Sequence, residues 1–316
     1  MNNTKNALQR QRNLRTARLV FTNIVRYFFL ISLSYVVLYQ IAYMLSQAFK
    51  PQEQIYDPSV VWVPKNFTLY NIKDALNALD YFPRLLRTVL IQVGSGLVEI
   101  FTCAIVAYGL ARFKFKANKL IFGLVLLTIL VPSQMLIIPT YLNYAHLDIL
   151  GIFGFLNKLT GMDIRPNILD TALTFYLPSI FGVGLRSGLF IFIYRQFFKK
   201  MPKELEEAAW IDGANPLRTF LSVIIPSAKV AITTVMTFSI IWSYNDYYLS
   251  AMYFSDNYPL AVALSSIASN ASIAGTDYAK VLKMAGCLLF IIPVLLVYMV
   301  LQKQFIQNID QVGIVG

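Results

Sequence analysis

Residues 207–226 read EAAWIDGANPLRTFLSVIIP and lie between two strongly apolar stretches of the chain. Ala208 and Ala209 are strong helix formers with little bulk, so another surface can come close to them. Gly213 can adopt a positive φ at low cost, and Asp212-Gly213 is therefore predicted to end this helix in a sharp turn. The start of the stretch is thus typical of a short, firmly terminated helix.

A second helix is predicted after this turn. Asn215 can cap it, and Pro216 suits the first turn that follows, where a missing N–H costs nothing. Apolar residues then recur at helical spacing and predict one apolar stripe; these residues are Leu217, Phe220, Leu221 and Ile224. Such an amphipathic helix either lies passively on a membrane surface or docks against another protein.

The rest of the chain is strongly apolar. Its mean hydropathy is +0.58 and only 14% of its residues are charged, whereas about 25% are charged in an average soluble domain. Six stretches are apolar over the roughly 20 residues that a membrane-spanning helix needs; they are 27–49, 88–111, 120–145, 171–194, 230–255 and 284–302. These stretches predict an all-α membrane protein with six transmembrane helices, and they argue against a large soluble helical core.

Basic residues are unevenly distributed between the two sides of this predicted bundle. Of the 27 Lys and Arg residues, 17 fall in the two termini and in the segments that follow the second and fourth spans. By the positive-inside rule, these segments and both termini face the cytoplasm. The net charge of +11 therefore reflects membrane topology, and no folded basic domain is predicted that would bind nucleic acid.

The chain divides into three predicted segments. They are a basic cytoplasmic tail at 1–26, a transmembrane domain at 27–305 that includes a basic cytoplasmic loop at about 195–229, and a cytoplasmic tail at 306–316. Cys103 and Cys287 both fall inside spans, which suits neither a disulfide framework nor a metal site. Because the sequence shows no nucleotide-binding or catalytic motif, we predict that this chain is not an enzyme and binds no cofactor or metal.

Residues 207–226 resemble the coupling loop of bacterial ABC importer permeases. That loop reads Glu-Ala-Ala, three residues, Gly, nine residues and an apolar triplet followed by Pro, and this chain keeps both spacings. One departure is Val-Ile-Ile-Pro in place of the usual Ile-x-Leu-Pro. The resemblance implies a type I ABC importer fold, in which a cytoplasmic coupling helix-turn-helix between spans 4 and 5 docks into a cleft on a separate ATPase. The implied ATPase-coupling residues are Glu207, Ala208, Ala209, Asp212, Gly213 and Pro226.

The C-terminal part of the chain resembles a narrower group. Residues 238–256 read FSIIWSYNDYYLSAMYFSD, and residues 258–264 read YPLAVAL. These segments and the last span are similar to those of carbohydrate importer permeases of the oligosaccharide family, in particular maltose-permease G-like subunits. The resemblance covers about 120–316 and departs at the C-terminus, where Val315-Gly316 stands in place of the Lys-Gly of many relatives.

This second resemblance implies a transport function and a set of partners. The chain is expected to form half of the translocation pathway for a sugar or oligosaccharide in a bacterial inner membrane. Its implied partners are a second, different permease subunit, two ATP-binding subunits that hold ATP and Mg, and an extracellular solute-binding protein. The alternatives are the same machinery with another cargo, such as glycerol phosphate or a modified glycan, and, less favoured, an ATP-independent carrier.

Polar residues inside the predicted spans are the remaining candidates, because charge is expensive to bury in a membrane. Tyr244, Asn245 and Asp246 lie about halfway along the fifth span. Their aromatic, amide and carboxylate groups suit substrate contact or gating, and the alternative is that they hold a helix break or contact the partner subunit. Glu99 and Arg186 are expected either to form an ion pair across the bundle or to pair with another chain.

Glycines and prolines in the spans predict close packing and kinks. Gly182, Gly184 and Gly188 allow helices to approach closely on either side of Arg186. Four prolines are expected to interrupt helical hydrogen bonding; they are Pro132, Pro139, Pro178 and Pro293.

Overall fold

The computed structural model describes residues 2–55, 57, 60, 62–148, 151–161, 164–184, 186–269 and 276–313. Within these ranges every regular element is a helix and none is a strand, which confirms the all-α prediction. Val315 and Gly316, where the sequence departs from its relatives, lie outside the described residues.

The helices follow one another along the chain with short connections. The α-helices are α1 (Asn2–Ala48), α2 (Tyr70–Ala78), α3 (Tyr81–Thr88), α4 (Gly94–Arg112), α5 (Asn118–Leu130), α6 (Ser133–Ala145), α7 (Ile152–Thr160), α8 (Leu173–Ile180), α9 (Ser187–Lys200), α10 (Glu204–Ile211), α11 (Pro216–Thr219), α12 (Ile225–Ser227), α13 (Lys229–Tyr244), α14 (Tyr248–Tyr253), α15 (Leu260–Ser266) and α16 (Asp277–Gly313). A 3-10 turn, η1 (Gln52–Gln54), and two π-helical segments, η2 (Val89–Val93) and η3 (Phe220–Ile224), complete the order.

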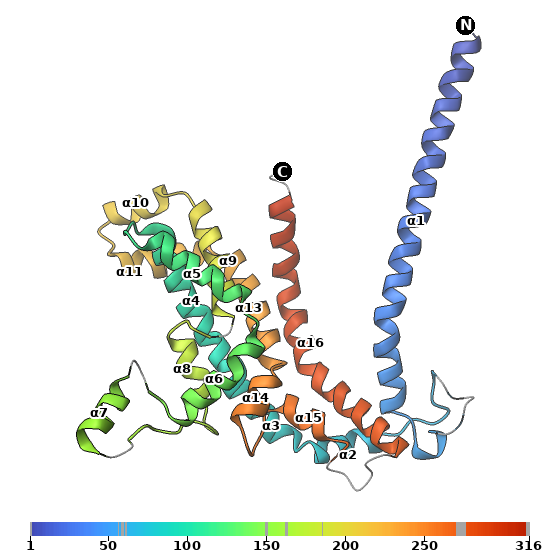
Figure 1. Cartoon of the computed structure of the whole chain (residues 1–316). Coiled ribbons are helices and arrows are strands. Elements are labelled where there is room, and N and C mark those ends of the chain that lie inside the picture. Colours follow the sequence, from blue (N-terminus) through green and yellow to red (C-terminus); the bar gives the residue numbers. More distant parts are fainter. Residues whose placement is uncertain are drawn as a thin grey trace.

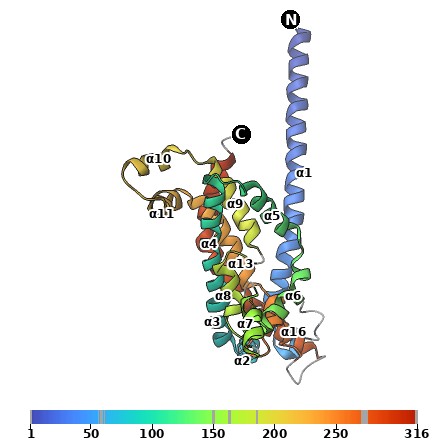
Figure 2. The same cartoon turned by 60° about the vertical axis from the view of Figure 1, so that its left-hand side comes forward.

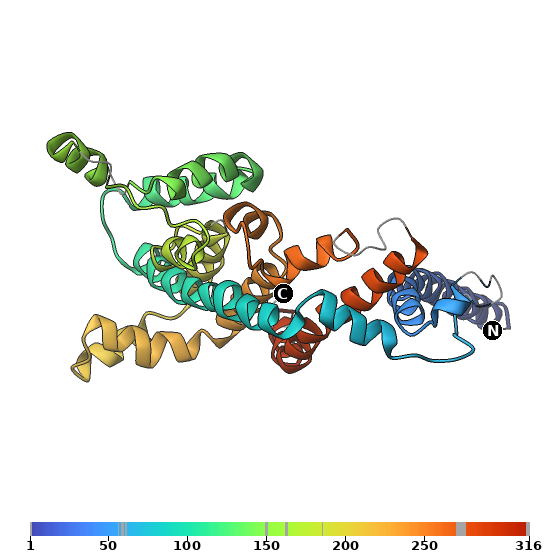
Figure 3. The same ribbon diagram turned by 90° about the horizontal axis from the view of Figure 1, so that it is seen from below.

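The helices form an elongated bundle with a separate first helix. α4 packs against α8, α9 and α13, and α5 packs on α9. α16 joins this group to α1 and α2, and Figures 1 and 3 show α1 standing apart from the rest. α1 has 47 residues, and at 1.5 Å per residue it extends about 70 Å. Most of its apolar side chains from Leu19 to Ile41 are exposed in the single chain, so lipid or another subunit must cover them.

The two ends of the molecule carry different elements. α10 and α11 project at the same end as both chain termini, whereas α2, α3 and α7 lie at the opposite end (Figures 1 and 2). The basic segments that the sequence places on one side of the membrane therefore also lie at one end of the bundle.

The helices are more broken than the six predicted spans. By length and composition, three helical stretches of the described chain can each cross a membrane; they are Arg15–Ala48, Tyr81–Arg112 and Asp277–Gln302. Two helix pairs qualify if each is counted as one bent span; they are Asn118–Leu130 with Gln134–Ala145, bent by 106°, and Pro216–Ser227 with Lys229–Tyr244, bent by 80°. The predicted number of six transmembrane helices is therefore not confirmed.

One proline and one glycine lie at two of the breaks in the predicted spans. Pro132 lies at the bend between α5 and α6, as predicted, whereas Pro139, Pro178 and Pro293 lie inside α6, α8 and α16. The predicted span 171–194 divides into α8 and α9, because the chain turns at Gly182 with a φ of +63°. This predicted span therefore consists of two helices, and its break lies at Gly182 and not at Pro178.

Three apolar clusters hold the helices together. The largest lies between α4, α9 and α13 and includes the fully buried Tyr194 and Phe198. The second packs α2, α3 and α15 against α16, and the third gathers Phe175 and Phe254 near α14. Because lipid is as apolar as these side chains, close packing rather than escape from water favours such contacts within a membrane.

Glycines permit the closest of these contacts. A Cβ added at Gly188 in α9 would lie 3.1 Å from the carbonyl oxygen of Val125 in α5, and one added at Gly96 in α4 would lie 2.8 Å from Oγ of Ser239 in α13. A Cβ at Gly184 would meet the Glu99 carboxylate. The predicted close packing around Gly184 and Gly188 is confirmed.

Replacing Gly188 by valine is expected to destabilise the bundle by about 1–3 kcal/mol, because the added groups overpack the contact between α5 and α9. The matched control is Gly123→Val in α5, where an added Cβ has no neighbour within 4 Å. Thermal unfolding of the two purified variants in detergent measures the difference. Equal melting temperatures would contradict the packing described here.

Candidate functional site

The projecting loop is built as the sequence predicts. α10 carries Glu204, Glu206 and Glu207 in its first turn, where the helix dipole favours acids. The chain then turns at Gly213, whose φ is +79°. Asn215 caps the next helix, since its side-chain oxygen accepts a hydrogen bond from the backbone N–H of Arg218 at 2.8 Å.

A buried ion pair fixes this loop to the bundle. Nε of Arg112, the last residue of α4, lies 2.8 Å from Oε1 of Glu206, and both side chains are only 6% exposed. The two atoms are not aligned for a hydrogen bond, so the contact is mainly electrostatic. Arg112 also donates through Nη2 to the carbonyl oxygen of Met201 at 2.9 Å. The end of α4 therefore holds both the start of α10 and the end of α9.

An aromatic cluster supports the same junction. The Tyr108 ring lies 5.0 Å from the ring of Phe220 and 5.9 Å from that of Phe198. The Glu206 carboxylate also lies close to the Tyr108 hydroxyl. Since these residues come from α4, α9, α10 and η3, the loop is packed onto the bundle as one body.

The outward face of the loop is apolar and acidic. Glu207 and Ala208 are exposed, whereas Glu206 and Ala209 are buried, because residues three apart share a face of a helix. Several large apolar side chains are exposed beside Glu207 and Ala208; they are Leu205, Trp210, Ile211, Leu217 and Leu221. We call these seven residues the exposed loop face.

The prediction that the apolar residues of the second helix form one face was wrong. Phe220 and Ile224 are buried against the bundle, whereas Leu217 and Leu221 are exposed. The two pairs lie on different faces, and the π-helical segment η3 widens the turn that contains them. One pair anchors the loop, and the other contributes to the exposed loop face.

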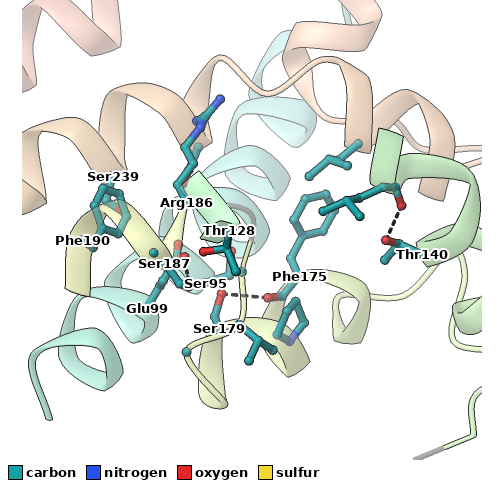
Figure 4. Close-up of a pocket in the computed structure, with 18 of the residues that line it drawn as sticks. Ser95, Glu99, Thr128, Thr140, Phe175, Ser179, Arg186, Ser187, Phe190 and Ser239 are labelled. Atoms are coloured by element: carbon teal, nitrogen blue, oxygen red, sulfur yellow. Dashed lines mark hydrogen bonds between the residues drawn. The ribbon is translucent and has the colours of Figure 1, made fainter. Parts of the chain in front are cut away.

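A cavity with several polar and charged side chains in a mainly apolar lining lies inside the bundle, away from the loop. It has a volume of about 420 Å³ and lies between α4, α5, α8, α9 and α13, with α6 and α14 at one side (Figure 4). Its polar and charged lining includes Gln92, Ser95, Glu99, Thr128, Thr140, Thr174, Ser179, Arg186, Ser187, Ser239, Ser243 and Asp246. Cavities of this size are typical of small-molecule sites.

The three predicted residues at the end of α13 face different surroundings. Asp246 lines the cavity and accepts hydrogen bonds from the backbone N–H and the hydroxyl of Ser250, both at 3.0 Å. Asn245 instead donates to the carbonyl oxygen of Ile241 at 2.7 Å, where α13 ends. Tyr244 is buried against α16 and donates to the carbonyl oxygen of Phe290 at 2.8 Å. Only Asp246 of the three is therefore placed to meet a molecule in the cavity.

Glu99 and Arg186 line the same cavity without forming the direct ion pair that was one expectation for them. The Glu99 carboxylate accepts a hydrogen bond from the Ser187 hydroxyl. The Arg186 guanidinium lies 4.6 Å from the centre of the Trp242 ring, and Figure 4 shows it turned away from Glu99. Arg186 is the residue that precedes α9, and its side chain leaves this turn towards Trp242 of α13.

Sequence reasoning missed the roles of two residues, Glu206 and Gln92. Glu206 looks the same as Glu204 and Glu207 in the sequence, and only the three-residue spacing to Ala209 hints at its buried face. Gln92 donates to the Ser250 hydroxyl at 2.5 Å and so connects η2 to α14, and no local pattern marks it. Among the described residues, no group of His, Cys, Asp or Glu is arranged to hold a metal ion.

Comparisons with known proteins agree with this geometry. Residues 100–311 match the family described as binding-protein-dependent transport system inner membrane component. A crystal structure of a bacterial ABC transporter involved in the import of the acidic polysaccharide alginate superposes with a TM-score of 0.73 at 22% identity, over 90% of this chain and 96% of that one. It shows the same fold.

Several relatives are permease proteins of carbohydrate or glycerol-phosphate transport systems. The diacetylchitobiose uptake system permease protein of Streptomyces coelicolor is 26% identical, over 89% of this chain and 85% of that protein. The polygalacturonan/rhamnogalacturonan transport system permease protein of Bacillus subtilis is 26% identical, over 88% and 93%. The sn-glycerol-3-phosphate transport system permease protein of Pectobacterium atrosepticum is 27% identical, over 81% and 85%. The chain therefore belongs to the family of inner membrane components of binding-protein-dependent transport systems, which are the permease subunits of ABC importers and not enzymes.

Proposed function

We propose that this chain forms half of the translocation pathway for a sugar or oligosaccharide in a bacterial inner membrane. The observation that carries this proposal is the anchored loop, whose exposed face is presented at one end of the bundle. A second, different permease subunit would complete the pathway. Two ATP-binding subunits would bind ATP and Mg and dock on the loop, and an extracellular solute-binding protein would deliver the cargo.

The orientation follows from charge and geometry together. The basic segments favour the cytoplasm, and the loop lies at the same end of the molecule as both termini. We therefore place the loop and both termini in the cytoplasm, where ATP-binding subunits can reach them. The opposite end, with α2, α3 and α7, would face the solute-binding protein.

The coupling role belongs to the exposed loop face and its turn. Glu207 and Ala208 lie on this face, whereas Ala209 is buried and supports α10 from below. Asp212 and Gly213 form the turn that sets the angle of the second helix, and Pro226 lies beyond η3 in α12. Closure of the ATP-binding subunits would then move α4 and α9 as rigid bodies, because the loop is fixed to both.

The names of the relatives support a carbohydrate cargo. The diacetylchitobiose and polygalacturonan/rhamnogalacturonan permeases match most of this chain at 26% identity. The glycerol-3-phosphate permease matches it at 27%, so a phosphorylated cargo is the second candidate. An ATP-independent carrier is disfavoured because it would leave the anchored loop without a role.

Gly213→Pro is expected to abolish copurification of the ATP-binding subunit while the second permease subunit is retained. Proline fixes φ near −65° and removes the N–H, whereas Gly213 has a φ of +79° and donates to the carbonyl oxygen of Trp210. The tagged chain is isolated from membranes in mild detergent and its partners are identified by mass spectrometry.

Gly161→Pro is the matched control, because Gly161 has a φ of +69° and donates to the carbonyl oxygen of Asn157 at the end of α7. This control should retain the ATP-binding subunit. Absence of any ATP-binding subunit from the wild-type preparation would contradict the proposed function, as would its full retention by Gly213→Pro.

Glu206→Gln is expected to loosen the loop in the isolated permease, because it leaves the buried Arg112 without its counter-ion. Removing one partner of a buried ion pair costs about 3–5 kcal/mol. Limited trypsin digestion should therefore cut at Arg218, in the loop, faster than in the wild type.

Glu207→Gln tests the other face of α10. It should leave the rate of tryptic cleavage unchanged and weaken only the recovery of the ATP-binding subunit, because Glu207 is exposed. Equal cleavage rates for the wild type and Glu206→Gln would show that the ion pair does not anchor the loop.

A further inference from the structure

A second cavity adjoins the one described above. It has a volume of about 300 Å³ and lies between the break that joins α5 to α6, the start of α9 and Trp242 of α13. Arg186 and Trp242 line both cavities, so the two meet at these side chains. Together they offer room for more than one unit of a small molecule.

The second cavity differs from the first in its charge. Among the described residues that line it, Arg186 is the only charged one. Glu99 and Asp246, the acids of the first cavity, do not line the second, and Figure 4 shows the Arg186 guanidinium turned away from Glu99. A molecule in the second cavity would therefore meet a positive charge and no carboxylate in its wall.

The two acids are held by other groups. Asp246 accepts hydrogen bonds from the backbone N–H and the hydroxyl of Ser250, both at 3.0 Å, and Glu99 accepts one from the Ser187 hydroxyl. Both acids are near enough to act on Arg186 electrostatically. Within the described chain, however, neither of them forms a hydrogen bond or an ion pair with the guanidinium.

The Arg186 guanidinium has no hydrogen-bond acceptor in the part of the chain that the structure describes. It has five N–H donors and stays protonated whatever the charge of the nearby acids. The Trp242 ring, whose centre lies 4.6 Å away, holds its flat face but accepts no hydrogen bond from its edges. A cation without an acceptor is costly inside a membrane. A carboxylate or a phosphate would accept two parallel hydrogen bonds from such an edge.

We propose that the second cavity binds the anionic group of the cargo, and that Arg186 selects a carbohydrate with a carboxylate or a phosphate over a neutral one. The inference rests on the proposed function, because it takes both cavities as part of the cargo pathway. The remainder of the same molecule would extend into the first cavity, past Trp242. The competing partner for Arg186 is an acidic side chain of the second permease subunit.

Protection of an introduced cysteine from N-ethylmaleimide measures occupancy of the second cavity. Gln134→Cys supplies an exposed lining position, and the chain without this substitution gives the background from Cys103 and Cys287. The tagged variant is purified with its partner subunits, and labelling of this chain is followed by mass spectrometry. The ligands form two matched pairs at one ionic strength, namely digalacturonate with its neutral methyl ester and glucose 6-phosphate with glucose.

The expected result is protection by at least one of the two anions and none by its neutral counterpart at the same concentration. A ligand at ten times its Kd slows labelling about tenfold. The anion that protects distinguishes a sugar acid from a sugar phosphate.

Substitution of Arg186 tests its role in this protection. Arg186→Gln, combined with Gln134→Cys, should raise the concentration needed for half-protection about tenfold or more, because the charge and the paired hydrogen bonds are lost. Arg186→Lys should have a smaller effect, since it keeps the charge and loses the planar fork.

Arg87→Gln is the matched control. The Arg87 guanidinium also lies over an aromatic ring, 4.9 Å from the centre of Phe254, and lines neither cavity. It should leave the protection unchanged. Equal melting temperatures show that the variants are folded, and the comparison within each ligand pair needs no substitution of Arg186.

Protection by a neutral ligand as strong as that by its anionic counterpart would overturn the inference, as would no protection by either anion. Loss of the second permease subunit from Arg186→Gln, without protection by an anion, would show that the cation serves the contact between subunits instead. Recovery of the ATP-binding subunit is measured on the same preparations. If that subunit is present while no anion protects, only this inference fails. If it is absent, the proposed function fails.

Discussion

The buried contact between Arg112 and Glu206 is the interaction on which the mechanical account depends. A surface loop tied by exposed charges would move independently of the helices, since exposed ion pairs are worth little. Here both side chains are buried, and Tyr108 and Phe220 seal the junction. A force applied to the exposed loop face is therefore transmitted to α4 and α9 instead of bending the loop.

The same helices that receive this force enclose the cavity. α4 runs from the Arg112 junction to Glu99 and Ser95, and α9 runs from Phe198 to Ser187. The helix breaks at Pro132, Gly182 and Asn245 lie around this region. They give side chains such as Arg186 and Asp246 access to the interior that a continuous helix would not, and neighbouring helices satisfy the freed backbone groups. The loop and the cavity are thus two ends of one packed unit.

Local features were predictable, and long-range ones were not. The turn at Gly213 and the cap at Asn215 follow from residue chemistry over a few positions, so the sequence predicts the loop well. The inward direction of Glu206 and the position of Arg186 over the Trp242 ring depend on Arg112 and Trp242, which are far away in the chain. The cavity lining is drawn from many helices, and its serines and threonines carry no pattern of their own. Orientation in the membrane remains a proposal from charge.

The most direct test of the central claim is photo-cross-linking in native membranes. A photoreactive phenylalanine analogue is placed at Ile211, which is 85% exposed on α10, and at Phe155 in α7, at the opposite end of the molecule. The account predicts a cross-link from Ile211 to an ATP-binding subunit, with a yield that changes when ATP is trapped, and none from Phe155. Cross-links from Ile211 only to lipid, or equally from both positions, would contradict it.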